Sequence, residues 1–176
     1  MIELILGGAR SGKSAFAERR ALESGFPVTF IATAVAQDAE MAARIAAHRA
    51  RRPKEWGLVE EPLALAAALR QAAGPEKCII VDCLTLWLTN LLDNPDPANE
   101  TLFQRERAAF METLPGLPGH IVLVSNEVGM GIVPMGELSR RFQDEAGWLH
   151  QDLGRVCDRV TLMMAGMPLT VKGTGG

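Results

Sequence analysis

Residues 2–14 constrain this chain most, because an apolar run leads directly into a glycine-rich turn and then into a segment of helical spacing. The turn reads Gly7-Gly8-Ala9-Arg10-Ser11-Gly12-Lys13-Ser14 and matches the pattern G-x-x-x-x-G-K-[ST]. In such a loop the backbone N–H groups converge on phosphate oxygens, and the N-terminus of the following helix adds a favourable dipole. The sequence therefore predicts a strand, a phosphate-binding loop and a helix, in that order.

Two side chains at the end of this loop predict how a triphosphate would be held. Lys13 is placed to reach the β and γ phosphates, and the Ser14 hydroxyl is placed to bind Mg²⁺. A further apolar run ends on Asp82, whose carboxylate is the second candidate ligand for Mg²⁺, at a Walker B position. The alternatives are a glycine-rich turn with an incidental lysine and, for Asp82, a helix cap. Triphosphate binding alone leaves motors, switches and kinases open.

Short apolar runs elsewhere predict the fold. They alternate with segments of helical spacing and cover residues 2–6, 28–33, 78–82, 121–125 and 160–164, and residues 169–171 could add an edge strand. Such continuous runs are typical of strands covered on both faces. We therefore predict an α/β, phosphate-loop nucleotide-binding domain of RecA-like type, with a mostly parallel sheet flanked by helices. A chain of 176 residues suits one domain, residues 1–176.

Composition narrows the function classes. The net charge is -3, and aromatic residues make up 5% with no Tyr, so nucleic-acid binding is not expected. No stretch reaches membrane-spanning length, and three cysteines without paired spacing predict buried thiols. We expect a cytoplasmic protein with no membrane span.

His48 has an unusual setting within a predicted helix, residues 38–52. Arg44 and Arg52 lie one turn before and one turn after it, so the three side chains share a face. Clustered guanidinium groups disfavour protonation of an imidazole and attract phosphates, which would make His48 a neutral nucleophile facing a triphosphate. The alternative is a solvated basic face with an incidental histidine. The other two histidines are expected to be ordinary surface or strand-edge residues.

Two stretches that follow predicted strands, residues 31–34 and 124–131, look specialised. Ligands gather at the carboxyl ends of parallel strands, so Thr33, Asp82 and the Asn126-Glu127 pair could line one crevice with the phosphate loop. For Asn126 and Glu127, a turn capped by polar side chains is the alternative.

Together these stretches resemble the bifunctional adenosylcobinamide kinase / adenosylcobinamide-phosphate guanylyltransferase family of cobalamin biosynthesis. The resemblance spans nearly the whole chain. It is carried by residues 7–14, residues 31–33, residues 38–45 leading to His48, and residues 126–134.

The resemblance implies that His48 forms a covalent guanylyl intermediate and releases pyrophosphate from GTP, before GMP passes to adenosylcobinamide phosphate. It also implies that ATP or GTP phosphorylates the aminopropanol hydroxyl of adenosylcobinamide. The loop motif itself makes Lys13 the further expected catalytic residue, because its charge would neutralise the triphosphate. The nucleotide contacts that the resemblance implies come from residues 7–14 and from Ala32, Thr33, Ala34, Arg49, Ala50, Arg51, Arg52, Glu60 and Asp82. The Mg²⁺ site expected on Ser14 and Asp82 comes from the loop motif.

The family resemblance also bears on assembly, because its members resemble homotrimers. An apolar cluster is either a subunit contact or a buried helix, and it comprises Leu86, Trp87, Leu88, Leu91 and Leu92. Some members carry His-His-Lys where this chain has Ala47-His48-Arg49, which puts a helper role for the preceding position in doubt. The competing functions are a single-function small-molecule kinase and a non-enzymatic GTP-binding switch. The chain has no guanine-reading N-K-x-D motif, which argues against the switch.

Overall fold

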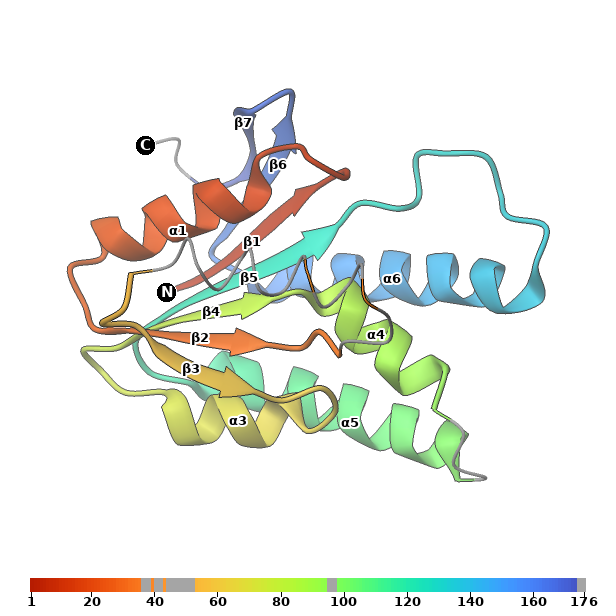
Figure 1. Ribbon diagram of the computed structural model, residues 1–176, viewed down its shortest axis with the longest axis horizontal. Coiled ribbons are helices and arrows are strands. Elements are labelled where there is room, and N and C mark those ends of the chain that lie inside the picture. The colour runs from red at the N-terminus through yellow and green to blue at the C-terminus, as the bar shows by residue number, and fades with distance from the viewer. Residues whose placement is uncertain (36–38, 40–42, 44–52, 95–97, 174–176) are drawn as a thin grey trace.

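The computed structural model describes residues 1–35, 39, 43, 53–94 and 98–173. Its strands form a seven-stranded sheet in the order β3-β2-β4-β5-β1-β6-β7 (Figure 1). The strands are β1 Ile2–Gly7, β2 Val28–Ala32, β3 Gly57–Glu60, β4 Cys78–Asp82, β5 His120–Asn126, β6 Arg159–Met164 and β7 Met167–Lys172. Neighbouring strands are parallel except β6 and β7, which are antiparallel. The predicted α/β fold with a mostly parallel sheet is confirmed.

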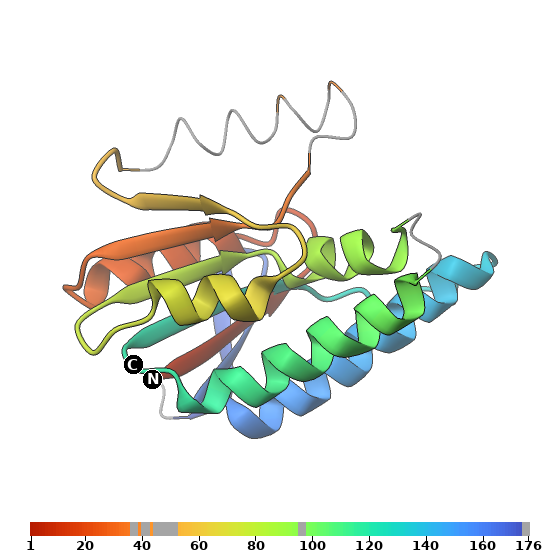
Figure 2. The ribbon, with the colours of Figure 1, turned by 90° about the horizontal axis from the view of Figure 1, so that it is seen from below.

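Helices cover both faces of the sheet. They are α1 Lys13–Glu23, α3 Leu65–Ala72, α4 Leu84–Leu92, α5 Asn99–Thr113 and α6 Glu137–Val156, and a 3₁₀ turn spans Leu114–Gly116. Helix α1 packs on one face, whereas α3, α4, α5 and α6 lie on the other (Figures 1 and 2). Within the described helices, none is both long enough and apolar enough to cross a membrane.

Alternate residues along the central strands divide the core between these two layers. Leu4, Ile79 and Leu123 pack against the four-helix side, and their neighbours Ile5 and Ile80 pack against the α1 side. All of them are almost completely buried. Because both neighbours in each pair must be apolar, the strands appear in the sequence as continuous apolar runs rather than as alternating ones.

Most strand predictions are correct to within two residues at each end, and the edge strand expected at residues 169–171 is β7. Strand β3 was not predicted, because three of its four residues are exposed and the segment lacks an apolar run. The cluster at residues 86–92 lies on α4, and Trp87, Leu88, Leu91 and Leu92 are buried inside the chain. The buried-helix interpretation of that cluster is therefore the correct one.

Helix α6 is buried over only part of its length. Ala146, Leu149 and Leu153 pack into the core, as the apolar spacing predicts. Leu138, nearer the start of the helix, is half exposed, and Phe142 is only partly buried. The N-terminal end of α6 extends beyond the sheet (Figure 1) and leaves part of its apolar stripe uncovered by the described core.

Candidate functional site

The predicted site residues that the structure describes meet at the carboxyl edge of the parallel sheet. Strand β1 ends at Gly7, β2 at Ala32, β3 at Glu60, β4 at Asp82 and β5 at Asn126. Gly7 is opposite Asn126 in the ladder, and Ala32 is opposite both Asp82 and Glu60. Ligands of open α/β sheets bind outside this edge.

The backbone of the phosphate loop, residues 7–14, requires glycine at two positions, Gly7 and Gly12. A Cβ atom at Gly7 would lie 2.9 Å from the Met163 carbonyl oxygen, so a larger residue does not fit there. Gly12 precedes α1 with a φ of 92°, a left-handed conformation that glycine adopts without steric cost. The loop is tied to the β6–β7 hairpin by the Gly166 N–H, which donates to the Ser11 carbonyl at 3.1 Å.

Lys13 and Ser14 are the first residues of α1, as the motif requires. The Lys13 ammonium curls back over the loop and donates to the Gly8 carbonyl at 3.0 Å. The Ser11 hydroxyl is buried and has no hydrogen-bond partner among the described residues. A buried hydroxyl of this kind fits a loop built to receive a polar ligand, because buried polar groups normally have partners.

Thr33 connects β2 to the end of β4. Its N–H donates to the Asp82 carbonyl at 3.1 Å, and its hydroxyl donates to the Cys83 carbonyl at 2.8 Å. The same hydroxyl accepts from the Cys83 N–H at 2.9 Å. Thr33 is completely buried. It therefore fixes the backbone that directly follows the Asp82 side chain.

Asn126 is joined to the start of α4 across the same edge. Its side-chain amide donates to the Thr85 hydroxyl at 2.8 Å and lies 3.6 Å from the Cys83 sulfur. Burial raises the pKa of the Cys83 thiol, and the nearby Asp82 carboxylate acts in the same direction. Cys83 is therefore a neutral packing group, and the three cysteines are all free and buried, as predicted.

Glu127 follows β5 and faces the phosphate loop. Its N–H donates to the Gly7 carbonyl at 3.0 Å, and it lines a cavity of about 400 Å³ together with the loop residues 8–11. The Glu127 carboxylate also accepts a hydrogen bond from the Gly129 N–H. A carboxylate is thus positioned beside the loop that would hold the phosphates.

His120 and His150 are more buried than ordinary surface residues, and His120, as the strand-edge alternative allows, is the first residue of β5. The side chains of His120 and His150 are only 9% and 8% exposed. His150 Nε2 is hydrogen-bonded to the Ser125 hydroxyl at 2.7 Å, and its Nδ1 lies 3.9 Å from the Glu127 carboxylate. Burial lowers the pKa of His150, against the opposing effect of Glu127. The sequence did contain a signal for the burial of His150. It lies four residues after Ala146 on α6, so the two side chains share the inner face of the helix.

The geometry at this edge agrees with the comparison of the sequence with family models. The model described as "Cobinamide kinase / cobinamide phosphate guanyltransferase" matches residues 3–171. The chain belongs to this family. It is a bifunctional cobinamide kinase and cobinamide-phosphate guanylyltransferase of adenosylcobalamin biosynthesis, which sets aside the single-function kinase and the non-enzymatic switch.

Curated relatives match along nearly all of their length. A bifunctional adenosylcobalamin biosynthesis protein CobP from Pseudomonas aeruginosa is 61% identical, with 98% of each chain covered. The CobU proteins of Escherichia coli and Salmonella typhimurium are 38% and 39% identical, with 98% of this chain and 100% of theirs covered. A solved structure from Pyrococcus horikoshii OT3 has a TM-score of 0.52 over 99% of this chain and 87% of that chain, and at 10% identity it shows the fold alone.

The remaining predicted site residues of this family member lie outside the described residues. They are His48, Arg49, Ala50, Arg51 and Arg52, together with most of the helix expected at residues 38–52. Their roles stay predictions.

Proposed function

We propose that both half-reactions of this enzyme use one triphosphate site, formed by the phosphate loop at the carboxyl edge of the sheet. What supports the proposal is that β1, which leads into the loop with Lys13 and Ser14, and β4, which ends at Asp82, finish at the same edge of the sheet, with Glu127 lining the cavity beside the loop. The loop amides and the N-terminus of the eleven-residue α1 provide the phosphate cradle. ATP or GTP serves the kinase step, and GTP serves the guanylyl transfer.

Mg²⁺ fits this donor set. The Ser14 hydroxyl and the Asp82 carboxylate are oxygen ligands of the kind that Mg²⁺ prefers, and the described residues contain no cluster of three acidic, histidine or cysteine side chains. Such a sparse protein shell suits an ion that keeps waters and phosphate oxygens as its other ligands. When bound, the ion would neutralise charge on the phosphates.

In the kinase step, the acceptor hydroxyl of adenosylcobinamide attacks the γ phosphorus of the nucleotide. A new oxygen–phosphorus bond forms, the bond to the bridging oxygen breaks, and a nucleoside diphosphate leaves. Lys13 stabilises the negative charge that develops on the phosphate oxygens. Of the two candidate bases, Glu127 and Asp82, Glu127 takes the hydroxyl proton, because it is the acidic side chain among the described residues that line the cavity beside residues 8–11.

In the transfer step, a nitrogen of His48 attacks the α phosphorus of GTP and pyrophosphate leaves. The phosphate of adenosylcobinamide phosphate then displaces the histidine, giving adenosylcobinamide-GDP. This assignment is supported by the family resemblance and by the arginines that surround His48 in the sequence. The further nucleotide contacts are Ala32, Thr33, Ala34, Arg49, Ala50, Arg51, Arg52 and Glu60.

The covalent step is tested with GTP labelled at the α phosphate. The wild-type protein should acquire an acid-labile, base-stable label, whereas the His48→Asn variant should acquire none. The control is transfer of γ-label from the nucleotide to adenosylcobinamide, which should persist in the variant because the phosphate loop is intact. Equal α-labelling of the variant would refute the role of His48.

We also propose that the enzyme works in the cytoplasm as a homo-oligomer, a homotrimer as the resemblance implies. The strand at one edge of the sheet supports a subunit contact, because β7 pairs with β6 on one side and has no neighbour on its other side among the described strands. Met167, Leu169 and Val171 project from one face of β7, and each is more than half exposed. Apolar side chains grouped on an edge strand are typical of surfaces that another chain covers.

A further inference from the structure

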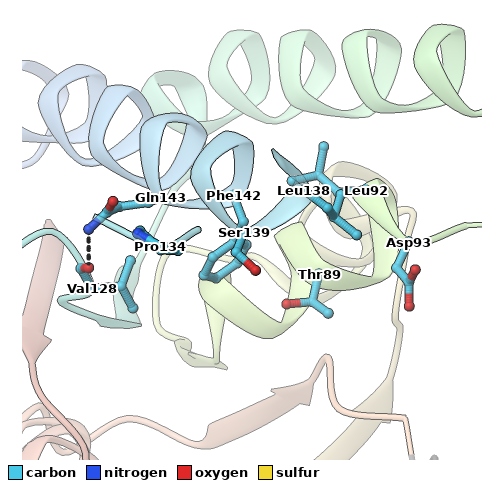
Figure 3. Close-up of a pocket in the computed structure, with 9 residues that line it drawn as sticks. All are labelled: Thr89, Leu92, Asp93, Val128, Pro134, Leu138, Ser139, Phe142 and Gln143. Atoms are coloured by element: carbon cyan, nitrogen blue, oxygen red, sulfur yellow. Dashed lines mark hydrogen bonds between the residues drawn. The ribbon is translucent and has the colours of Figure 1, made fainter. Parts of the chain in front are cut away.

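A cavity of about 360 Å³ lies between α4, the start of α6 and the loop that follows β5 (Figure 3). We call it the α4–α6 cavity. Its wall is mainly apolar, and Leu92, Phe142 and Pro134 belong to it. The loop is fixed to α6 because the Gln143 amide donates to the Val128 carbonyl at 2.9 Å, as the dashed line shows.

The α4–α6 cavity shares two connections with the phosphate site. Val128 lines the cavity, and the preceding Glu127 is bonded through its N–H to Gly7 and faces the phosphate loop. Thr89 also lines the cavity, and the following Asn90 donates to the Thr33 carbonyl at 2.7 Å. Val128 and Glu127 are neighbours that line the two cavities, and Asn90 ties the cavity helix α4 to the end of β2, so a single ligand can reach from one cavity past Glu127 to the other.

The loop between the two cavities carries exposed apolar side chains. Met130 lines the cavity beside the phosphate loop and is 75% exposed, and Ile132 and Met135 are each 97% exposed. Val133 is 65% exposed. This apolar surface continues from the phosphate side toward Pro134 and Leu138 of the α4–α6 cavity.

The acceptor of this family has the chemistry that such a surface recognises. Cobinamide is a large corrin macrocycle with methyl groups and primary amides at its rim, and its reacting hydroxyl stands at the end of a short arm. The ring cannot enter a phosphate cleft, so it must rest on apolar surface beside that cleft. The adenosylated form carries a net positive charge, and Asp93 alone is charged among the residues described in the cavity wall.

We propose that the α4–α6 cavity receives the rim of the corrin ring while the arm reaches the phosphate loop past Glu127. The apolar wall packs against ring methyl groups, and the Ser139 and Thr89 hydroxyls face rim amides. Asp93, at the end of the cavity away from Val128, attracts the cationic ring. This inference rests on the proposed function for its acceptor, and it assigns a binding site to that acceptor.

The test fills the cavity and measures each ligand separately. Ser139→Trp places an indole in the cavity, and Asp144→Trp places one on an exposed position of the same helix as a matched control. Binding of adenosylcobinamide is followed by equilibrium dialysis and visible absorption, without turnover. We expect Ser139→Trp to weaken this binding about tenfold or more, as a steric clash does, and Asp144→Trp to leave it unchanged.

Nucleotide binding and assembly are measured on the same variants. The GTP affinity of Ser139→Trp should stay within about twofold of the wild-type value, because Ser139 is not among the residues that line the cavity beside the phosphate loop. A tenfold change in affinity would correspond to about 1.4 kcal/mol of binding free energy. Unchanged acceptor affinity in this variant would overturn the proposal. So would a smaller assembly in sedimentation, because a second copy of the chain would then occupy the cavity.

A second variant keeps the proposal testable if Ser139→Trp does not fold. Asp93→Asn should weaken adenosylcobinamide binding roughly threefold at low salt and reduce its dependence on ionic strength. An affinity and salt dependence equal to those of the wild type would contradict the role of Asp93. Failure of the proposed function would be seen in a different measurement, in which the wild-type protein takes up no GMP from GTP. The two failures can be told apart because acceptor binding is measured without turnover.

Discussion

Glu3 is the second residue of the central strand β1, and its carboxylate is completely buried. Arg20 donates to it through two nitrogens, at 2.7 and 3.1 Å, and His120 Nε2 lies 2.9 Å from the same carboxylate. Burial by itself raises the pKa of Glu3, but the hydrogen bonds from His120 and Arg20 outweigh it and lower the pKa to about 2. The folded state therefore holds the ionised form.

Glu3→Gln should destabilise the protein by about 3 kcal/mol at pH 7, because it leaves Arg20 without its buried partner. A folded pKa below the ordinary 4.5 contributes stability that is complete above pH 4.5 and is lost as the pH falls toward about 2. The variant should lack this loss, so the two unfolding free energies should converge in acid. Urea titrations at several pH values measure this, and Glu23→Gln, which removes an exposed partner of Arg20, should cost under about 0.5 kcal/mol.

Lys13→Met should slow both half-reactions by about 10²- to 10³-fold, the usual effect of removing one donor that stabilises developing charge. The fold should persist, because the one hydrogen bond described for the ammonium group is the exposed contact to Gly8. Rates of γ-label transfer and of enzyme guanylylation check this. Arg19→Met on the exposed side of α1 is the control, and equal slowing there would show that the effect is not specific to the loop.

The sequence predicts the positions of residues in a contiguous motif, but it does not predict contacts between residues that are far apart in the chain. Lys13 and Ser14 were predictable, because eight consecutive residues specify the loop and no residue distant in the sequence is needed to recognise it. Glu3 and His120 were not, since 117 positions separate them and only the parallel ladder brings them together. His150 meets Ser125 in the same way, across a long connection.

At the scale of elements, α6 brings His150 beneath the carboxyl end of β5. The pKa of His150 lies below its ordinary value of 6.5 because of burial. As the pH falls from about 7 to 5, the unfolded chain takes up this proton before the folded chain does, so the wild type loses stability. His150→Gln should show a smaller fall in unfolding free energy over this range. Chemical denaturation at pH 5, 6 and 7 measures it, and parallel pH profiles would contradict the prediction.

The elements themselves were predictable where burial on both faces leaves continuous apolar runs. β4 and β5 are such strands, and their bounds were correct to within one residue. β3 pairs with the sheet at one edge only and exposes most of its side chains, so its sequence carries no apolar signal. Candidate ligand residues at strand ends were located by the same logic, because the carboxyl ends of parallel strands share one edge.

For the whole molecule, we propose that residues 1–176 form one domain, since a single sheet joins residues from both ends of the chain. β1 and β5 pair across more than a hundred positions, so neither half of the sheet is complete without the other. Thermal unfolding should therefore be one cooperative transition when followed by far-ultraviolet circular dichroism and by tryptophan fluorescence. Two separate transitions would show independent parts.

The same transition reports on assembly, because subunit contacts that exist only in the folded state stabilise it by mass action. The Tm of the wild type should rise with protein concentration. Leu169→Lys places a charge on the exposed apolar face of β7 and should reduce both the assembly mass and this concentration dependence, with little change to the folded subunit.

Lys172→Ala at the same strand's end is a poor control, because the Lys172 ammonium donates to the Gly154 and Arg155 carbonyls. Thr170→Lys is the better control, because it adds the same charge on the opposite face of the strand. An equal loss of assembly mass in Thr170→Lys would contradict a subunit contact through the Leu169 face.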